Sequence, residues 1–461
     1  MPDFDGDVIV AGGGISGLAC AWWLQQRGLR VLLLEAAGRT GGCIGTTREQ
    51  GYLVESGPNS ILDTSPLISR LLDEVAIGAE RLEANPAARN RFVLKNGVLV
   101  PVPLSPAAFV ATPLFSMRAK LRLLGEPFIA RADSDSEESV AEFVRRRLGD
   151  EFLDYAINPF VGGVYAGRPE LLSLRAAFPR LHALEQQYGS LICGQLFGAR
   201  KRAGAPAKSK HDAAMFSFRD GMATLTAAIT RQLARVEMNC TVESVSRDGA
   251  GYVVNALRGN NGCTFRAPAV VVAVPAYAAG LLVEPIAPAA AAALRAIEYP
   301  PVAVVCSAYA RETIAHRLNG FGVLVPEREG HQTLGTIFSS ALFEGRAPAG
   351  KVLLTTFVGG MRQPDLARLD ESALAGLVGR ELGLLLGASA PPELVHVKQW
   401  ARAIPQYKLR HHARMREIDA AERALPGLFF CANYRGGVSV GDCIVSADLV
   451  AAAAGRFLFA G

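Results

Sequence analysis

The sequence has 461 residues, half of them hydrophobic and 20% charged, which is enough for two or three domains with large cores. Its 48 basic and 43 acidic residues give a formal net charge of +5 without a basic stripe interleaved with aromatic residues, which argues against nucleic-acid binding. Eight cysteines without a C-x-x-C pair favour reduced thiols in a cytosolic protein. No histidine stands at a metal-ligand spacing, so no metal site is expected.

The chain begins with a predicted strand, turn and helix. Asp7 to Ala11 predicts a buried strand, and Gly12, Gly14 and Gly17 follow it with G-x-G-x-x-G spacing at the start of an apolar helix. The first glycine permits a tight turn, the second lets the backbone approach a pyrophosphate, and the third lets the helix pack on the strand. The sequence therefore predicts a dinucleotide site at this helix N-terminus, where the backbone of Ile15 and Ser16 begins the first turn.

A second predicted strand, Leu29 to Leu34, ends at Glu35. Glu35 lies near the spacing at which an acidic residue meets a ribose hydroxyl. Arg39 and the pair Gly41-Gly42 come soon after, and such a segment suits a second approach to the pyrophosphate. This segment favours FAD over NAD.

The middle of the chain predicts two insertions into a discontinuous dinucleotide-binding region. Strands at 239–246, 251–257 and 267–275 extend that region, with Val242 as a backbone contact to the adenine end. The first insertion, about 102–210, is helical, and its apolar and basic residues interleave over 113–124. This pattern fits either a face against anionic lipid or an ordinary amphipathic helix, and the residues alone favour the second. The basic run Arg200-Lys201-Arg202 predicts a solvated loop.

The second insertion, about 280–399, predicts a mixed or antiparallel sheet lining a substrate pocket. Its strands are expected at 301–308, 320–326, 334–343 and 352–359. The longest apolar stretch identified, 268–294, is broken by three prolines and Glu284, so no membrane-spanning helix is expected.

Near the C-terminus, a glycine-rich stretch precedes a helical run over 443–455. Val440, Gly441 and Asp442 could contact the ribityl chain and pyrophosphate of FAD. Alternatively, Gly441-Asp442 could serve only as a helix N-cap. The N-terminal unit tips the balance towards FAD. No nucleophile elbow or zinc-protease motif occurs, so the chemistry belongs to the flavin.

Five motifs in sequence order together resemble the oxygen-dependent protoporphyrinogen oxidases: 55–60 (ESGPNS), 163–167 (GVYAG), 320–326 (GFGVLVP), 334–340 (LGTIFSS) and 434–442 (YRGGVSVGD). The resemblance implies an α/β fold with an FAD-binding Rossmann-type, amine oxidase-like domain. A mixed-sheet substrate domain and a helical membrane-associated domain would complete it. The expected FAD domain comprises 1–88, 206–279 and 400–461, the substrate domain 89–101 and 280–399, and the helical domain 102–205.

The resemblance also implies an activity. Noncovalent FAD would take electrons from protoporphyrinogen IX in three two-electron steps, and dioxygen would become hydrogen peroxide. The enzyme would be peripherally associated with the cytoplasmic face of a membrane, could form a homodimer, and could hand its product to ferrochelatase. Three rivals stay open: a coproporphyrinogen III oxidase of the same fold, another flavin amine oxidase or desaturase, and a noncatalytic flavin-binding scaffold.

Matched position by position, the resemblance places Asn59 beneath the flavin, with Gly57 and Pro58 of the same motif at the cofactor. Arg91 would meet a substrate propionate, and Gly163 would lie at the substrate site. Leu324 and Phe357 would sandwich the macrocycle, beside Ile337, where the family often has leucine. The residues alone would instead favour a solvated Arg91, and Leu324 and Phe357 as core residues.

Overall fold

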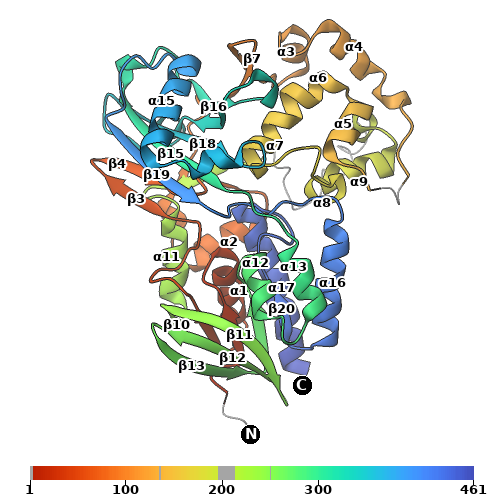
Figure 1. Ribbon diagram of the computed structural model, residues 1–461, viewed down its shortest axis with the longest axis vertical. Coiled ribbons are helices and arrows are strands. Elements are labelled where there is room, and N and C mark those ends of the chain that lie inside the picture. Colours follow the sequence, from red (N-terminus) through yellow and green to blue (C-terminus); the bar gives the residue numbers. More distant parts are fainter. Residues whose placement is uncertain (1–3, 134–136, 196–212, 250, 461) are drawn as a thin grey trace.

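The computed structural model describes residues 4–133, 137–195, 213–249 and 251–460. Figure 1 shows a lower unit, where the red, green and blue parts of the chain come together, below a unit with a large sheet and a helical unit. Residues 196–205 of the expected helical domain, and the basic run at 200–202, lie outside the described residues.

The lower unit is built on a five-stranded parallel sheet with strand order β10-β2-β1-β14-β20. The central strands are buried along their whole length, as expected for a parallel sheet covered on both faces. This sheet confirms the predicted Rossmann-type unit. Its strands are β1 (Val8–Ala11), β2 (Val31–Leu34), β10 (Val236–Glu237), β14 (Ala269–Val272) and β20 (Leu428–Phe430).

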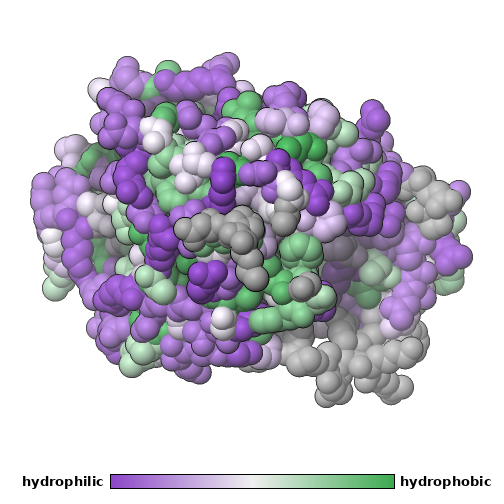
Figure 2. Space-filling model, turned by 90° about the horizontal axis from the view of Figure 1, so that it is seen from below, coloured by the Kyte–Doolittle hydropathy of each residue, from purple (hydrophilic) through white to green (hydrophobic). Residues whose placement is uncertain are grey.

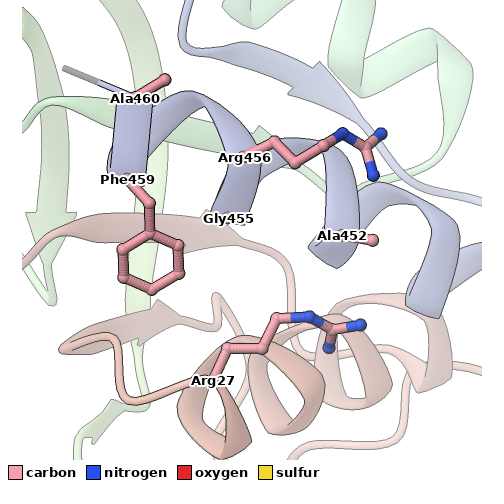
Figure 3. A pocket seen from close by; sticks show the side chains of 6 residues that line it. All are labelled: Arg27, Ala452, Gly455, Arg456, Phe459 and Ala460. Atoms are coloured by element: carbon pink, nitrogen blue, oxygen red, sulfur yellow. The ribbon is translucent and has the colours of Figure 1, made fainter.

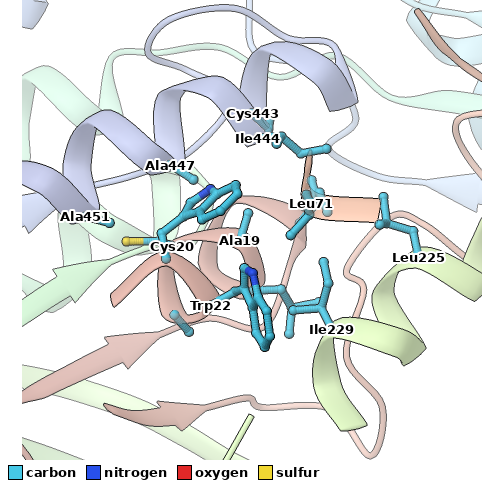
Figure 4. Close-up of a cluster of buried hydrophobic side chains, with 14 of the residues drawn as sticks. Ala19, Cys20, Trp22, Leu71, Leu225, Ile229, Cys443, Ile444, Ala447 and Ala451 are labelled. Atoms are coloured by element: carbon cyan, nitrogen blue, oxygen red, sulfur yellow. The ribbon is translucent and has the colours of Figure 1, made fainter. Parts of the chain in front are cut away.

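Helices cover one face of this sheet. Helix α1 (Ile15–Gln26) is buried from Ile15 to Leu24 and packs beside α17 (Val440–Ala460), α11 (Ala223–Gln232) and α2 (Pro66–Glu74). Figure 4 shows Ala19 and Trp22 of α1 among side chains from these helices. A helix that is apolar all round belongs in a core, and α1 occupies that place here.

The other face of the sheet carries an antiparallel three-stranded sheet and three helices. Strands β11 (Cys240–Asp248), β12 (Gly251–Arg258) and β13 (Asn261–Ala267) form that sheet. They share a core with α12 (Ala276–Leu282), α13 (Pro288–Arg295) and α16 (His411–Ala424). This core continues to Tyr299, past the expected boundary between residues 279 and 280.

Helix α17 corrects one expectation. By length and composition it could cross a membrane, whereas no such segment was expected from the sequence. Several of its small and apolar residues, including Ile444, Ala447 and Ala451, are fully buried in the lower unit's core. Its apolar character is therefore explained in part by its packing against α1.

The upper sheet has seven strands in the order β19-β15-β18-β17-β16-β7-β8, and only β16 and β7 pair in parallel. This confirms the predicted mixed sheet. Helix α15 (Glu371–Leu386) packs its leucines on one face. The strands are β7 (Asn90–Lys95), β8 (Val98–Pro101), β15 (Val302–Ala310), β16 (Gly320–Leu324), β17 (Thr333–Ile337), β18 (Lys351–Gly359) and β19 (Leu394–Trp400).

The predicted strand 334–343 is wrong in its second half. Strand β17 ends at Ile337, and a helical turn, α14 (Ser339–Leu342), follows. The Ser339 hydroxyl forms a hydrogen bond with the Thr355 hydroxyl (2.8 Å), and the Ser340 hydroxyl accepts from the Leu353 amide (2.9 Å). These side-chain bonds replace strand pairing, as serines often do where regular structure ends.

Three short pairings connect the lower unit to the upper sheet. Strands β3 (Thr46–Glu49) and β4 (Tyr52–Glu55) form a hairpin, and β9 (Met215–Phe218) pairs with both β5 (Ile61–Leu62) and β6 (Arg81–Glu83). Tyr52 and Val54 of β4 share a core with residues of the upper sheet. The two units are therefore in direct contact at β4.

The helical unit lies at the upper right in Figure 1. Its interior holds Arg147, which bonds Glu126 (3.0 Å) and Glu185 (2.5 Å), and all three side chains are buried. Its helices are α3 (Pro106–Ala111), α4 (Met117–Leu124), α5 (Val140–Arg147), α6 (Asp150–Phe152), α7 (Asn158–Tyr165), α8 (Leu174–Ala177) and α9 (Pro179–Tyr188), with a π-helical turn, Leu153–Ile157, before α7.

Candidate active site

The N-terminus of α1 is open, as a phosphate site requires. No side chain caps this helix, and a Cβ added at Gly14 would meet no heavy atom within 4 Å. A Cβ at Gly17 would instead lie 1.9 Å from the carbonyl oxygen of Gly12. Gly17 is thus needed for the helix to pack on the turn. The space at Gly14 and the uncapped N–H groups suit a pyrophosphate.

Glu35 lies at the end of β2, against the glycine-rich turn. Its carboxylate accepts hydrogen bonds from the amides of Gly13 (2.7 Å) and Ala37 (2.8 Å). Strand β11 begins beside it, because the Cys240 amide donates to the Glu35 carbonyl (2.9 Å). Val242 follows in the same strand, next to a bulge. Glu35 and Val242 therefore lie on one side of the turn, where the adenosine half of a dinucleotide was expected.

Arg39 holds its own turn together. Its guanidinium donates to the carbonyls of Thr40 (3.1 Å), Gly42 (3.1 Å) and Ile44 (2.8 Å). The Gly41 amide donates to the Gly13 carbonyl (2.7 Å). The turn at 40–44 is thereby fixed directly on the glycine-rich turn, and Arg39 stabilises it through its backbone carbonyls.

Four segments that are distant in sequence meet at this end of α1. A Cβ at Gly42 would lie 3.3 Å from the Gly14 Cα, and one at Gly57 would lie 2.2 Å from the Cys43 carbonyl oxygen. A Cβ at Gly441 would lie 3.3 Å from the Leu62 carbonyl oxygen. The Cys431 thiol approaches the Ser16 carbonyl (3.7 Å). Gly42, Gly57 and Gly441, which were predicted to contact the cofactor, thus each lie close to the backbone of another segment.

The C-terminal segment forms the helix cap that its sequence allowed, and it lies next to the start of α1. Asp442 accepts from the Ser439 amide (3.3 Å), and the Ser439 hydroxyl accepts from the Asp442 amide (3.1 Å), so this pair caps α17. Val440 and Gly441 form the first turn of α17, next to the start of α1. Two helix N-termini, each with a positive dipole end, therefore lie side by side.

Tyr407 also belongs to this region, although no sequence motif predicts it. Its hydroxyl donates to the Asn433 carbonyl (2.6 Å) and accepts from the Gly437 amide (3.1 Å). Its ring stacks on His411 with 4.2 Å between ring centroids. Burial raises the pKa of Tyr407 well above its usual value. The neutral phenol of Tyr407 therefore fixes the loop before α17, and no residue spacing near Tyr407 predicts this role.

Glu55 anchors the strand that leads into the 55–60 motif. It accepts from the Met222 amide (2.8 Å) and the Thr46 hydroxyl (2.7 Å), and the guanidinium of Arg346 lies 3.7 Å away. Burial raises the pKa of Glu55 to about 7. Arg346 also donates to the Ser217 hydroxyl (2.7 Å). These contacts fix the start of the motif from two neighbouring units.

The rest of this motif lies against the upper sheet. The Asn59 side-chain amide donates to the Gly57 carbonyl (3.1 Å) across Pro58. The Trp400 indole of β19 donates to the Ser56 carbonyl (2.8 Å). The loop 56–59 is therefore held between the lower unit, through Gly57, and the upper sheet, through Trp400.

Four predicted substrate residues share one face of the upper sheet. Leu324, Gly335 and Phe357 are aligned across β16, β17 and β18, and Gly322 pairs with both Ile337 and Arg91. Since directly paired residues project to the same side, the side chains of Arg91, Leu324, Ile337 and Phe357 lie on one face. The opposite face, with neighbours such as Phe92, Val323 and Val358, packs on α15.

This face is less completely covered than the other. Leu324, Ile337 and Phe357 are each only partly buried. Arg91 is exposed, and its guanidinium lies 5.7 Å above the ring of Phe321. Gly163 of α7 faces Leu324, because a Cβ at Gly163 would lie 2.6 Å from the Leu324 Cδ2. The sheet face thus offers apolar side chains beside the exposed guanidinium of Arg91, next to the 56–59 loop.

A surface hollow elsewhere does not belong to this site. It has a volume of about 550 Å³ and is lined by Arg27, Ala452, Arg456 and Phe459, which Figure 3 shows between α1 and α17. It adjoins Arg27, at the opposite end of α1 from Gly14. The face of the molecule seen from below mixes hydrophilic residues with smaller hydrophobic areas (Figure 2).

The chain is similar to known proteins along nearly its whole length. The family described as "Flavin containing amine oxidoreductase" matches residues 15–454. Protoporphyrinogen oxidase 2 of Arabidopsis thaliana is 34% identical over 96% of this chain and 93% of its own length. Coproporphyrinogen III oxidase of Bacillus subtilis (strain 168) is 29% identical over the whole of both chains.

Solved structures show the same fold. A candidate protoporphyrinogen oxidase of Exiguobacterium sp. 255-15 superposes with a TM-score of 0.81 and 23% identity, covering 97% of this chain and 98% of its own. Cyclohexylamine oxidase of Brevibacterium oxydans IH-35A superposes with a TM-score of 0.69 and 19% identity, covering 98% and 99%. The amine oxidase-like fold is therefore shown along nearly the whole chain.

Proposed function

The chain belongs to the flavin-containing amine oxidoreductase family, and from this premise we propose that it oxidises protoporphyrinogen IX to protoporphyrin IX. It is a flavin oxidoreductase of the porphyrinogen oxidase type, with FAD as its cofactor. The conversion removes three pairs of electrons with their protons, and three molecules of dioxygen become hydrogen peroxide. When bound, FAD supplies the two-electron acceptor for the substrate and the donor for dioxygen.

The residues at the end of α1 fit FAD. The open space at Gly14, the uncapped first turn and the adjoining N-terminus of α17 suit a pyrophosphate. Glu35 ends β2 where a ribose hydroxyl is expected, and the 56–59 loop lies between this end and the upper sheet. The chain's own task is to hold the substrate beside that loop and to limit access of water.

The observation that carries the proposed substrate class is the incompletely covered face of the upper sheet. A tetrapyrrole is a large apolar plate with anionic tails, and it needs apolar contacts and a cation more than an acid–base pair. Leu324, Ile337 and Phe357 would supply the apolar contacts, and Arg91 would bind a propionate. Asn59 would lie at the meeting point of substrate and cofactor.

Charge on the same sheet face favours protoporphyrinogen over coproporphyrinogen, which carries four propionates instead of two. By register, Lys95, Lys351 and His396 also project from this face. Each of these three is paired with a carboxylate at 2.5–3.3 Å. Among the described residues of this face, Arg91 and Lys398 have no such partner. Lys398 lies on β19, five strands away from β7, so Arg91 is the cation beside the apolar contacts, and such a sparsely charged face suits two propionates better than four.

The direct experiment compares the two porphyrinogens as substrates of the purified holoenzyme. We expect kcat/KM to be higher for protoporphyrinogen IX, with formation of fluorescent porphyrin and release of peroxide. A preference for coproporphyrinogen III would replace the proposed substrate with the second candidate, which the Bacillus subtilis relative supports. Peroxide release with an amine substrate, and with neither porphyrinogen, would reject both candidate substrates.

We further propose that the helical unit docks on an anionic membrane surface on the cytoplasmic side. Its outer residues Val110, Met117, Leu121, Leu124 and Phe128 are 60–90% exposed, on and next to α3 and α4. Such a group of apolar side chains on a water-facing surface is unusual, and basic residues of α4 interleave with it. Cosedimentation with anionic vesicles tests this, and equal binding to neutral vesicles would contradict the electrostatic contribution.

A further inference from the structure

A polar seam joins the helical unit to the upper sheet, close to the proposed substrate face. It lies between the π-helical turn before α7 and the turn that follows β16. Asn158 accepts from the Glu327 amide (2.9 Å), Tyr155 donates to the Glu329 carboxylate (3.2 Å), and Arg328 donates to Asp154 (2.8 Å). Inserted π-helical turns often occur at functional sites.

Arg362 is the buried cation of this seam. It follows Phe357 by one tight turn, and its side chain is 6% exposed. Its guanidinium donates to the Val325 carbonyl (2.7 Å) and to both the backbone carbonyl (2.6 Å) and side-chain oxygen (2.8 Å) of Asn158. The nearest carboxylate, Glu327, is 4.0 Å away. Arg362 therefore bonds chiefly to uncharged oxygens on two different units.

Two adjacent glycines of α7 make this approach possible. A Cβ at Gly162 would lie 2.5 Å from Nη2 and 2.8 Å from Cζ of Arg362, so the guanidinium rests on the bare backbone of Gly162. A Cβ at Gly163 would lie 2.6 Å from Cδ2 of Leu324. Glycine pairs lower the stability of a helix interior, and here each one makes room for a specific side chain of the sheet unit.

We propose that Arg362 is a positioning residue that sets the distance between α7 and the upper sheet, and thereby the position of Leu324 over the substrate. Its bond to Val325 acts on the residue directly after Leu324. Its bonds to Asn158 act on the first turn of α7, one helical turn before Gly163. The inference rests on the proposed function, because Leu324 matters here as a substrate contact.

The test uses the holoenzyme with three variants and one matched control. Arg362→Met keeps an unbranched apolar stem but removes every donor, Arg362→Lys restores one charged donor group, and Gly162→Ala displaces the guanidinium from the side of α7. The control is Arg328→Met, which breaks the exposed ion pair to Asp154 in the same seam. KM and kcat for protoporphyrinogen IX, FAD content and melting temperature are measured for each.

Weaker contacts to the bound tetrapyrrole reduce binding of the ground state and of the transition state alike, which raises KM more than it lowers kcat. We expect Arg362→Met and Gly162→Ala each to raise KM about tenfold with kcat within about twofold, and with FAD content unchanged. Arg362→Lys should recover part of the loss, and Arg328→Met should behave as wild type. In Arg362→Met, adding Gly162→Ala should cause no further loss, because the displaced group is already absent.

Additive effects of the two substitutions, or an equal effect of Arg328→Met, would overturn the proposal. So would losses that follow FAD content or melting temperature. If the wild-type enzyme oxidises neither porphyrinogen, the proposed function fails, and amide exchange over 158–165 tests the positioning separately. Faster exchange in Arg362→Met but not in Arg328→Met would support it, and unchanged exchange would overturn it.

Discussion

Substitution of Gly14 by valine separates cofactor binding from folding. Gly14 has φ −70° and ψ 175°, which valine adopts readily, and its Cβ direction meets no protein atom within 4 Å. The folded apoprotein should therefore accept Gly14→Val, at a cost of about 1 kcal/mol or less for changing the N-cap residue. The added methyl groups would occupy the space that we assign to the pyrophosphate.

The loss of affinity follows from the hydrogen bonds that this helix end provides. If the valine keeps the phosphates from two N–H groups of the first turn, the loss is about 3–6 kcal/mol, at about 1.5–3 kcal/mol for each charge-assisted bond. Since about 1.4 kcal/mol corresponds to a factor of ten, FAD affinity should fall about 10²- to 10⁴-fold. The variant should lose its yellow colour on gel filtration.

The assay pairs flavin absorbance after gel filtration with the melting temperature of the apoproteins, because bound FAD itself stabilises the fold. Gly17→Ala is the matched control. Its Cβ would lie 1.9 Å from the Gly12 carbonyl oxygen, so it should lower apoprotein stability as well as FAD binding. A Gly14→Val protein that stays yellow, or that unfolds like Gly17→Ala, would refute the reasoning.

Four further predictions test other parts of the site. Arg91→Ala should reduce kcat/KM about 10- to 150-fold, the equivalent of roughly 1.5–3 kcal/mol, mainly through KM, with partial recovery in Arg91→Lys; an unchanged KM would make Arg91 an ordinary surface residue. Gly163→Ala should raise KM without loss of FAD, because its Cβ would displace Leu324; steady-state kinetics with flavin quantification checks this. Burial raises the pKa of Glu55 to about 7, so the folded state binds the proton more tightly than the unfolded state does. The free energy of unfolding should therefore fall by up to about 3 kcal/mol as pH rises from about 5 to 7. Denaturant titrations of Glu55→Gln should lack that decline. FAD should be released by acid precipitation, as expected of a noncovalent cofactor, and flavin retained in the pellet would contradict this.

Local sequence patterns were sufficient for the dinucleotide-binding unit. The strand, glycine-rich turn and helix lie within about twenty residues, so their spacing alone predicts the geometry around Gly14 and Gly17. The mixed sheet was also predictable from its apolar segments. The second half of 334–343 was not, because Ser339 and Ser340 bond to β18 through side chains, and hydropathy does not register such bonds.

The supporting contacts of the site could not be predicted, because they join segments far apart in the sequence. Trp400 meets Ser56, Tyr407 meets Gly437, and Arg362 meets Asn158, and no fixed spacing along the chain connects these pairs. Helix α17 was not expected as an apolar span of this length, because Asp442, Asp448 and Arg456 interrupt its apolar residues.

An anaerobic titration tests the central claim most directly. Holoenzyme is mixed with protoporphyrinogen IX under argon, and oxidised flavin absorbance and porphyrin fluorescence are followed together before dioxygen is admitted. We predict that the flavin absorbance is lost before oxygen enters, and that oxygen then restores it, with three molecules of peroxide released for each porphyrin formed. Flavin that stays oxidised in the presence of protoporphyrinogen would contradict the proposed function.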